Sequence, residues 1–182
     1  MAVAYALQRP PDGGAVVSCR LTKLERRTAL VRLYRAEGAL RRRCAIIAAR
    51  LELAASALVL LEVACHADAS LDDLDAFAEA RGIVLVTPMS RLRAWVHALV
   101  GWVADLWPAS TARVYGGVLA EMHANAAIAT SLHRACLASS DARAADWCDL
   151  WAEQRAALAS RLGATLAEAP QQEAVEAGGF LA

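Results

Sequence analysis

The sequence predicts an all-α protein, an up-down bundle of four to five helices. Three observations lead to this expectation. Of the 182 residues, 44 are alanine and 25 are leucine, and both residue types favour helices. Aromatic residues make up only 5% of the chain, and an all-β fold would need more of them. Apolar residues also recur at spacings of three and four, which is typical of helices that bury one face. The length fits a single domain.

The first third of the chain carries the strongest helical pattern. Residues 1–17 contain the run PPDGG and are expected to form a flexible leader, followed by a bundle domain over 18–168. Between 19 and 66 there is no proline and only one glycine. Two series at seven-residue spacing share one helical seam there. They are Leu30, Glu37, Cys44, Leu51, Leu58 and Cys65, and Leu33, Leu40, Ile47, Ala54 and Leu61. This pattern fits either one helix of about 45 residues or two helices that meet at a concealed turn near Arg50.

A short helix is expected next. Ser70 is followed by an acidic residue three positions later, which predicts an N-cap for a helix over 71–81. Gly82 would end that helix. The run IVLVT at 83–87 has β character and stops at Pro88, but it has no partner strand. We expect it to form a buried extended crossover.

The remaining residues predict three long helices and a tail. Ser90 is expected to cap a helix that ends before Pro108. The two further helices would cover 111–138 and 142–167, with serine and aspartate residues between them. Residues 169–182 are rich in Gln, Glu and Gly and are expected to be a disordered tail.

The zero net charge of the chain hides an uneven distribution. Residues 1–50 contain 11 basic and 3 acidic side chains, whereas residues 51–182 contain 8 and 16. Two interpretations remain open: complementary halves of one bundle, or a basic surface for an acidic partner such as nucleic acid or another anionic surface. Base stacking is disfavoured, because only Tyr34 lies among the arginines. The residues of such a surface would be Arg26, Arg27, Arg41, Arg42 and Arg43.

Segment composition predicts a cytoplasmic protein without a transmembrane segment. The N-terminus lacks the pattern of a signal peptide. The longest apolar stretch, 51–65, contains two glutamates and falls short of the roughly 20 residues that span a bilayer. The five cysteines include no C-x-x-C pair, which is typical of buried thiols in a reducing compartment.

Polar residues that interrupt the apolar stripes are the candidates for function, because burying a charge without a partner is costly. Glu37 stands on the seam of the first helix, and Glu62 and His66 share a face of the next. Glu121 and Asn125 interrupt the stripe over 111–138, and Gln154 that of the last helix. Inward carboxylates from several helices are typical of a site for two iron or manganese ions. The alternative is that these groups hydrogen-bond to one another and fix the helix register.

Four short motifs resemble the bacterial stress-induced ferritin-like proteins. They are LYRAE at 33–37, Glu62 with His66, LAEMHANAA at 119–127 and WAEQR at 151–155. The resemblance implies a four-helix bundle that pairs as a homodimer. It also implies a di-iron or manganese centre with Glu37, Glu62, His66 and Glu121 as ligands. The match departs from the family at Cys65, which occupies the third position after Glu62, and at Asn125.

Two functions follow as expectations. The first is a ferritin-like protein of stress or metal handling with a partly degenerate carboxylate site. The second is a non-enzymatic adaptor, chaperone-type or viral accessory protein that acts through protein–protein interaction.

Overall fold

The described part of the chain is entirely built around helices. The computed structural model describes residues 13–50, 55–85 and 111–179. Their regular elements are α1 (Gly13–Arg50), α2 (Ala55–Glu79), α4 (Thr111–Ala138) and α5 (Ala142–Gly179). The all-α prediction is confirmed. The helix expected between Ser90 and Pro108 lies outside the described residues.

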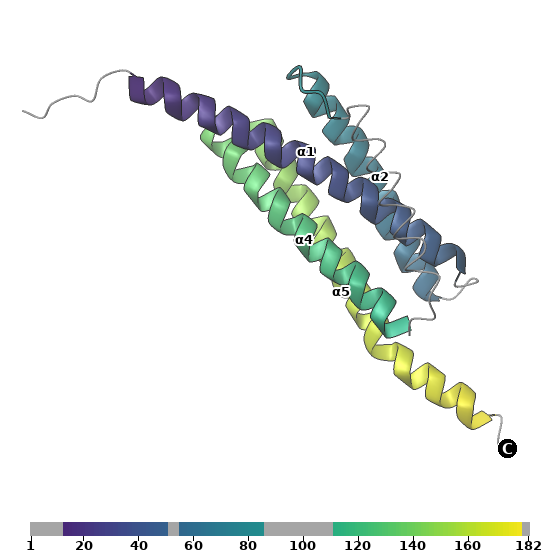
Figure 1. The fold of residues 1–182 in the computed structure, drawn as a ribbon. Coiled ribbons are helices and arrows are strands. Elements are labelled where there is room, and N and C mark those ends of the chain that lie inside the picture. Colours follow the sequence, from purple (N-terminus) through teal and green to yellow (C-terminus); the bar gives the residue numbers. More distant parts are fainter. Residues whose placement is uncertain (1–12, 51–54, 86–110, 180–182) are drawn as a thin grey trace, which may run out of the picture.

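The four helices pack around a common axis (Figure 1). α1 lies against α2 and α4, and α5 lies against α4 and α2. α1 and α2 form one antiparallel hairpin and α4 and α5 a second, while α2 and α4 run in the same direction. This arrangement agrees with alternating directions if the helix expected between Ser90 and Pro108 runs opposite to both α2 and α4. α2 ends at one end of the bundle and α4 begins at the other, and residues 86–110, which lie outside the described part, come between them in the chain.

The long seam of the N-terminal third divides into two helices. α1 ends at Arg50 and α2 begins at Ala55, so of the two alternatives the structure shows two helices. Within α1 the predicted seam is buried, and Leu33, Glu37 and Leu40 are fully inaccessible. The series therefore describes the core face of α1 correctly.

The same series does not describe α2. Leu58 and Leu61 are 57% and 45% exposed, and Cys65 is exposed as well. The buried positions are instead Leu60 and Val63, among others. The series belongs to one continuous helix, so its register does not carry over from α1 to the separate helix α2 and predicts the wrong face there.

α2 runs through the position where a new helix was expected. Ser70 is not an N-cap, because its hydroxyl donates to the backbone oxygen of His66, 2.7 Å away, inside the helix. Gly82 does end the helix, with a φ of 62°. The amide of Ile83 donates to the oxygen of Ala78 at 2.8 Å, which is the Schellman pattern. The described part of the extended run, 83–85, has no regular structure, and Leu85 is buried.

The α4–α5 turn uses the same geometry without a glycine. Ser140 has a φ of 57°, and the amide of Asp141 donates to the oxygen of Cys136 at 2.9 Å. Asp141 then caps α5, since its Oδ1 faces the amide of Ala144 at 3.4 Å. The boundaries at Ala138 and Ala142 agree with the predicted ones.

Both outer helices extend further than the sequence predicted. α1 begins at Gly13, inside the segment expected as a leader. α5 continues past Ala167 to Gly179, through most of the segment for which composition predicted a disordered tail. None of the described helices is long and apolar enough to cross a membrane.

The apolar core consists of two clusters at different heights along the bundle. One contains Leu33, Leu132 and Trp151, and the other contains Leu40 and Met122. Between these clusters, each described helix places one buried polar residue on its inner face, and α2 adds the buried Ala67. The bundle therefore has a polar layer between two apolar halves.

Candidate functional site

The polar layer takes one or more residues from every described helix. Its members are the four buried polar residues of the described chain: Glu37 from α1, Ser70 from α2, Asn125 from α4 and Arg155 from α5. Glu37 is 0% exposed and Arg155 2% exposed. Each occupies a position where the helix would otherwise continue an apolar stripe, which is why it points inward.

Both oxygens of the Glu37 carboxylate are engaged. The amide nitrogen of Asn125 donates to Oε1 at 2.7 Å, and Nη2 of Arg155 forms an ion pair with Oε2. The layer therefore joins α1, α4 and α5 through one carboxylate. A buried charge is tolerated only when it is paired and hydrogen-bonded in this way.

Arg155 connects the carboxylate to the aromatic part of the layer. Its guanidinium lies over the Trp151 ring, 4.9 Å from the centroid. The Trp151 indole N–H donates to the Ser70 hydroxyl at 3.0 Å, and Ser70 in turn donates to the backbone of His66. The polar layer thus continues from Glu37 through Arg155 and Trp151 to α2.

Burial governs the titration of the central groups. It raises the pKa of Glu37, and the charge and hydrogen bonds of Arg155 and Asn125 only partly oppose that shift. Burial likewise lowers the pKa of Arg155, against the effect of Glu37. Burial, with the nearby Glu121 charge, raises the pKa of the Cys44 thiol to about 12, so Cys44 stays a neutral thiol.

The other predicted ligands face different partners. Nε2 of His66 lies 3.0 Å from Oε1 of Gln154, and burial together with the Arg155 charge lowers the pKa of His66. Glu62 is exposed and accepts from Nη2 of Arg161 at 3.0 Å. Each of these contacts lies outside the polar layer.

Glu121 also points away from the layer. It pairs with Arg43 of α1, and its side chain is 40% exposed. A close approach of Arg43 to the backbone at Gly117 accompanies this pair, since a Cβ there would lie 2.8 Å from the guanidinium. Glu37, Glu62, His66 and Glu121 therefore do not come together as a ligand set.

The residues of the layer do not fit a di-iron or manganese centre. Within residues 13–50, 55–85 and 111–179, no group of three or more His, Cys, Asp or Glu side chains could hold a metal ion. The one carboxylate at the centre, Glu37, already neutralises the permanent positive charge of Arg155. A cation there would be repelled by Arg155 and would lack further anionic ligands.

Arg155 is the central residue that the sequence analysis missed. Gln154, named instead, is exposed. The available signal was spacing: Arg155 follows Trp151 by four residues and precedes Leu162 by seven, and all three are buried. Asn125, by contrast, is buried as expected.

The expected basic surface on α1 is partly neutralised. Arg26, Arg41 and Arg43 form ion pairs with Asp141, Asp68 and Glu121. Arg27 and Arg42 remain exposed and have no recorded carboxylate partner among the described residues.

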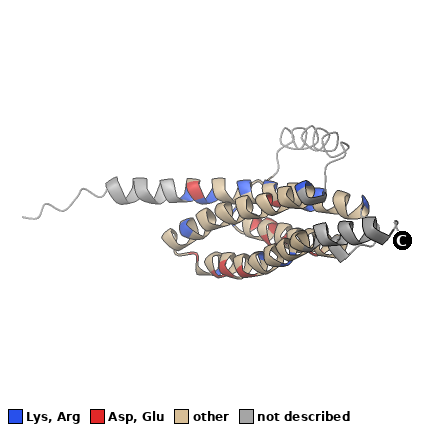
Figure 2. Ribbon diagram, turned by 90° about the horizontal axis from the view of Figure 1, so that it is seen from below, with Lys and Arg blue, Asp and Glu red and all other residues tan. Residues whose placement is uncertain are grey.

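Two further arginines of α1, Arg32 and Arg35, are also exposed and form no ion pair with a described carboxylate. We call Arg27, Arg32, Arg35 and Arg42 the basic face of α1. Figure 2, in which the ribbon is coloured by residue type, shows basic positions repeated along α1, whereas most acidic residues belong to α2 and α5.

Comparison with models of protein families, with curated proteins and with solved structures gave no match for this chain. The polar layer and the basic face are therefore interpreted from their own chemistry.

Proposed function

We propose that this protein is a non-enzymatic interaction protein with a ferritin-like bundle, in which a buried ion pair occupies the place of a metal centre. The observation that carries the proposal is the contact between Arg155 and Glu37 in the middle of the core. It converts the carboxylate that a metal would need into half of a neutral pair.

Topology supports the ferritin-like part of the proposal. Ferritin-like bundles have two antiparallel helix pairs and one long crossover. Here the α1–α2 and α4–α5 hairpins are two such antiparallel pairs, and α2 and α4 run in the same direction. Such bundles build their sites from side chains on facing helices at mid-height, which is also where the polar layer lies.

The polar layer supports a structural role. A buried polar contact in a bundle fixes the register between helices, because any shift leaves its members unpaired. Glu37 needs both Asn125 and Arg155 at one height. The layer would thereby keep the outer faces in a fixed arrangement.

The basic face of α1 supports binding of an acidic protein surface. Its arginines are exposed, and the face carries no aromatic residue that would stack on bases. A cluster of like charges without local partners is typical of a surface that steers and binds an oppositely charged partner. The free thiols Cys44, Cys65, Cys136 and Cys148 further support a reducing compartment such as the cytoplasm.

The first test is metal analysis of protein purified without chelator from iron-supplemented cells. We expect well below one iron or manganese ion per chain. One or more ions per chain, lost in the Glu37→Ala variant, would overturn the proposal in favour of metal handling.

The second test measures binding of a polyglutamate peptide by fluorescence anisotropy at low and high salt. We expect binding that weakens as salt rises and is lost in the double variant Arg35→Glu/Arg42→Glu. The control is Arg113→Glu, because Arg113 is also exposed but lies on α4. Equal binding by the double variant and the control would contradict the assignment of the face. Tighter binding of a DNA duplex than of the peptide would contradict the class of partner.

A further inference from the structure

A cleft with a volume of about 660 Å³ lies at the end of the bundle where α5 begins. It is lined by side chains from α1, α2, the α4–α5 turn and the first turns of α5. Its size falls within the range of sites for small molecules, roughly 300–1,000 Å³. None of the four members of the polar layer lines this cleft, although its Trp147 ring lies 6.3 Å from the Trp151 ring.

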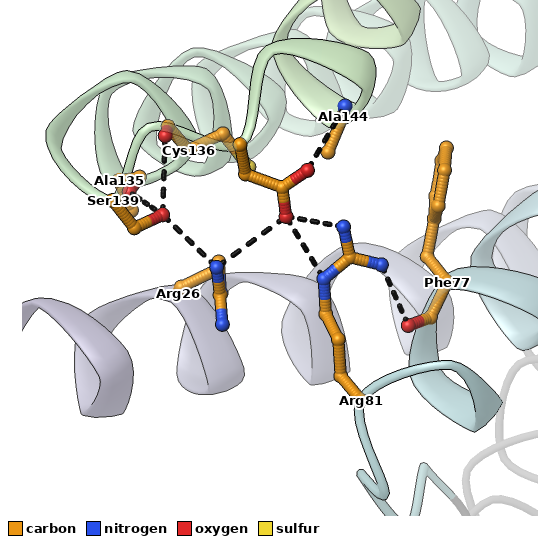
Figure 3. A network of polar contacts seen from close by, with 8 residues as sticks. Arg26, Phe77, Arg81, Ala135, Cys136, Ser139 and Ala144 are labelled. Carbon is orange, nitrogen blue, oxygen red and sulfur yellow. Dashed lines mark hydrogen bonds and ion pairs between the residues drawn. The ribbon is translucent and has the colours of Figure 1, made fainter.

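The charges around this cleft are unequal (Figure 3). Arg26 and Arg81 share one carboxylate oxygen, Oδ2 of Asp141, at 3.4 Å from Nη1 of Arg26 and 2.9 Å from Nε of Arg81. The other oxygen of Asp141 faces the amide of Ala144. The single carboxylate of Asp141 therefore accepts hydrogen bonds from two guanidinium groups and from the N-terminus of α5.

A third arginine adds to the excess of positive charge. Arg143 lines the cleft, is exposed, and has no recorded carboxylate partner among the described residues. The other acidic residue of the lining, Asp73, accepts the indole N–H of Trp147 at 2.8 Å. The first turn of α5 contains no acidic residue, so the positive end of its dipole is countered only by the capping Asp141.

The hydrogen-bond capacity of Arg26 is also incompletely used. Nη1 donates to the Ser139 hydroxyl at 2.9 Å, whereas the buried Nε has no partner within the described part of the chain. Arg26 therefore keeps one unused donor among the residues that line the cleft.

Aromatic side chains form the other wall of the cleft. Phe77 and Trp147 meet edge to face, with ring centroids 5.5 Å apart. The Arg81 guanidinium lies over the Phe77 ring at 5.4 Å, and it also donates to the Phe77 backbone oxygen, as Figure 3 shows. The arginine side chains of the cleft thus lie directly beside the aromatic rings of Phe77 and Trp147.

We infer that this cleft binds a small organic anion, with its phosphate or carboxylate group at Arg143 and the start of α5 and its apolar part against Trp147. Guanidinium groups and helix N-termini are the usual partners of such oxyanions. The aromatic wall adds selectivity for anions that carry a ring or a short chain over inorganic ions.

The test uses thermal unfolding of the whole chain at constant ionic strength, with phenyl phosphate, benzoate and inorganic phosphate as probes. At about ten times Kd, a bound probe should raise the Tm by about 3 °C. A larger rise in Tm with phenyl phosphate than with benzoate, or the reverse, shows whether the cleft prefers a phosphate or a carboxylate group. The difference between phenyl phosphate and inorganic phosphate shows how much the aromatic ring adds to binding.

Arg143→Glu is the decisive variant, since Arg143 is exposed and holds no other residue in place. We expect its affinity for the effective probe to fall at least tenfold, while Arg113→Glu retains the wild-type affinity. The inference is overturned if no probe at 10 mM raises the Tm, or if both variants lose affinity equally. Neither residue lies on α1, so a failure here leaves the proposed basic face untouched.

Discussion

Replacing Arg155 by methionine tests the central contact of the core directly. Methionine has a similar length and no charge, so the substitution leaves the Glu37 carboxylate buried without its counter-ion. Removing one partner of a fully buried pair costs about 3–5 kcal/mol, because an uncompensated charge stays in the core. Loss of the contact with Trp151 contributes to this cost, about 1–2 kcal/mol for a desolvated cation–π pair.

Urea denaturation is the appropriate assay. With a slope of about 2 kcal/mol/M, a loss of 4 kcal/mol would lower the unfolding midpoint by about 2 M. The matched control is Arg161→Met on the same helix. Arg161 and Glu62 form a pair that is 55% and 44% exposed, so this control should lose less than about 1 kcal/mol.

The effect should also depend on pH in a defined direction. Burial raises the pKa of Glu37, and the Arg155 charge is the largest opposing effect. An acid whose pKa is raised by folding destabilises the protein as pH rises through that pKa. Without Arg155 the pKa rises further, so the deficit of Arg155→Met relative to wild type should be larger at pH 8 than at pH 5.

A double variant completes the cycle. Glu37→Leu/Arg155→Met removes both charges and should recover most of the lost stability, since apolar replacements of buried pairs are often neutral or stabilising. The reasoning is refuted if Arg155→Met lies within about 1 kcal/mol of wild type at pH 8. It is equally refuted if the double variant loses as much unfolding free energy as the single variants Glu37→Leu and Arg155→Met lose together.

Three further predictions concern the end of the bundle and the thiols. Ser140→Gly should stabilise the protein by about 1 kcal/mol, seen as a rise in Tm, because Ser140 has a φ of 57°, in the left-handed region that glycine adopts without strain. The control Ser139→Gly should instead lower the Tm, because it removes a hydrogen-bond partner of Arg26. Asp141→Ala should cost about 2–3 kcal/mol in the same melts, through loss of a helix cap and of an acceptor for two arginines. Burial opposes the shift, but Arg81 and Arg26 hold the pKa of Asp141 below its usual range. The stability difference between wild type and Asp141→Ala should therefore shrink as pH falls through the pKa of Asp141 in the folded protein, and a difference that stays constant would contradict this reasoning. Cys65, which is exposed, should react with a thiol reagent much faster than the buried Cys44, Cys136 and Cys148, and an unchanged fast phase in Cys65→Ser would contradict this.

The helices of this protein follow closely from local sequence. Alanine and leucine content predicted the class, and the serine and aspartate residues at 139–141 predicted both boundaries of the α4–α5 turn. The seam of α1 left open whether one helix or two cover 19–66. These features depend on residues near one another in the chain, whose spacing determines which face is apolar. Glu37 and Asn125 were recognised as inward polar residues for the same reason.

The identity of their partners could not be derived in this way. Ser70 looked like a helix cap, but it lies inside α2 and accepts the indole N–H of Trp151 from α5. Glu62 and Glu121 looked like members of a metal site, but each meets an arginine from another helix at the surface. A local pattern assigns a residue to a face, and the neighbour that it meets there depends on how distant helices align.

The sequence by itself thus determined an all-helical chain with a few polar interruptions in its apolar stripes. Only the tertiary structure decided what those interruptions do. Arg155 lies 118 residues from Glu37 in the chain, and their contact depends on the relative height of α1 and α5. That height is a property of the packed bundle and cannot be derived from local sequence patterns. Glu37, which the sequence pattern predicted as a metal ligand, therefore forms an ion pair with Arg155 in the folded protein.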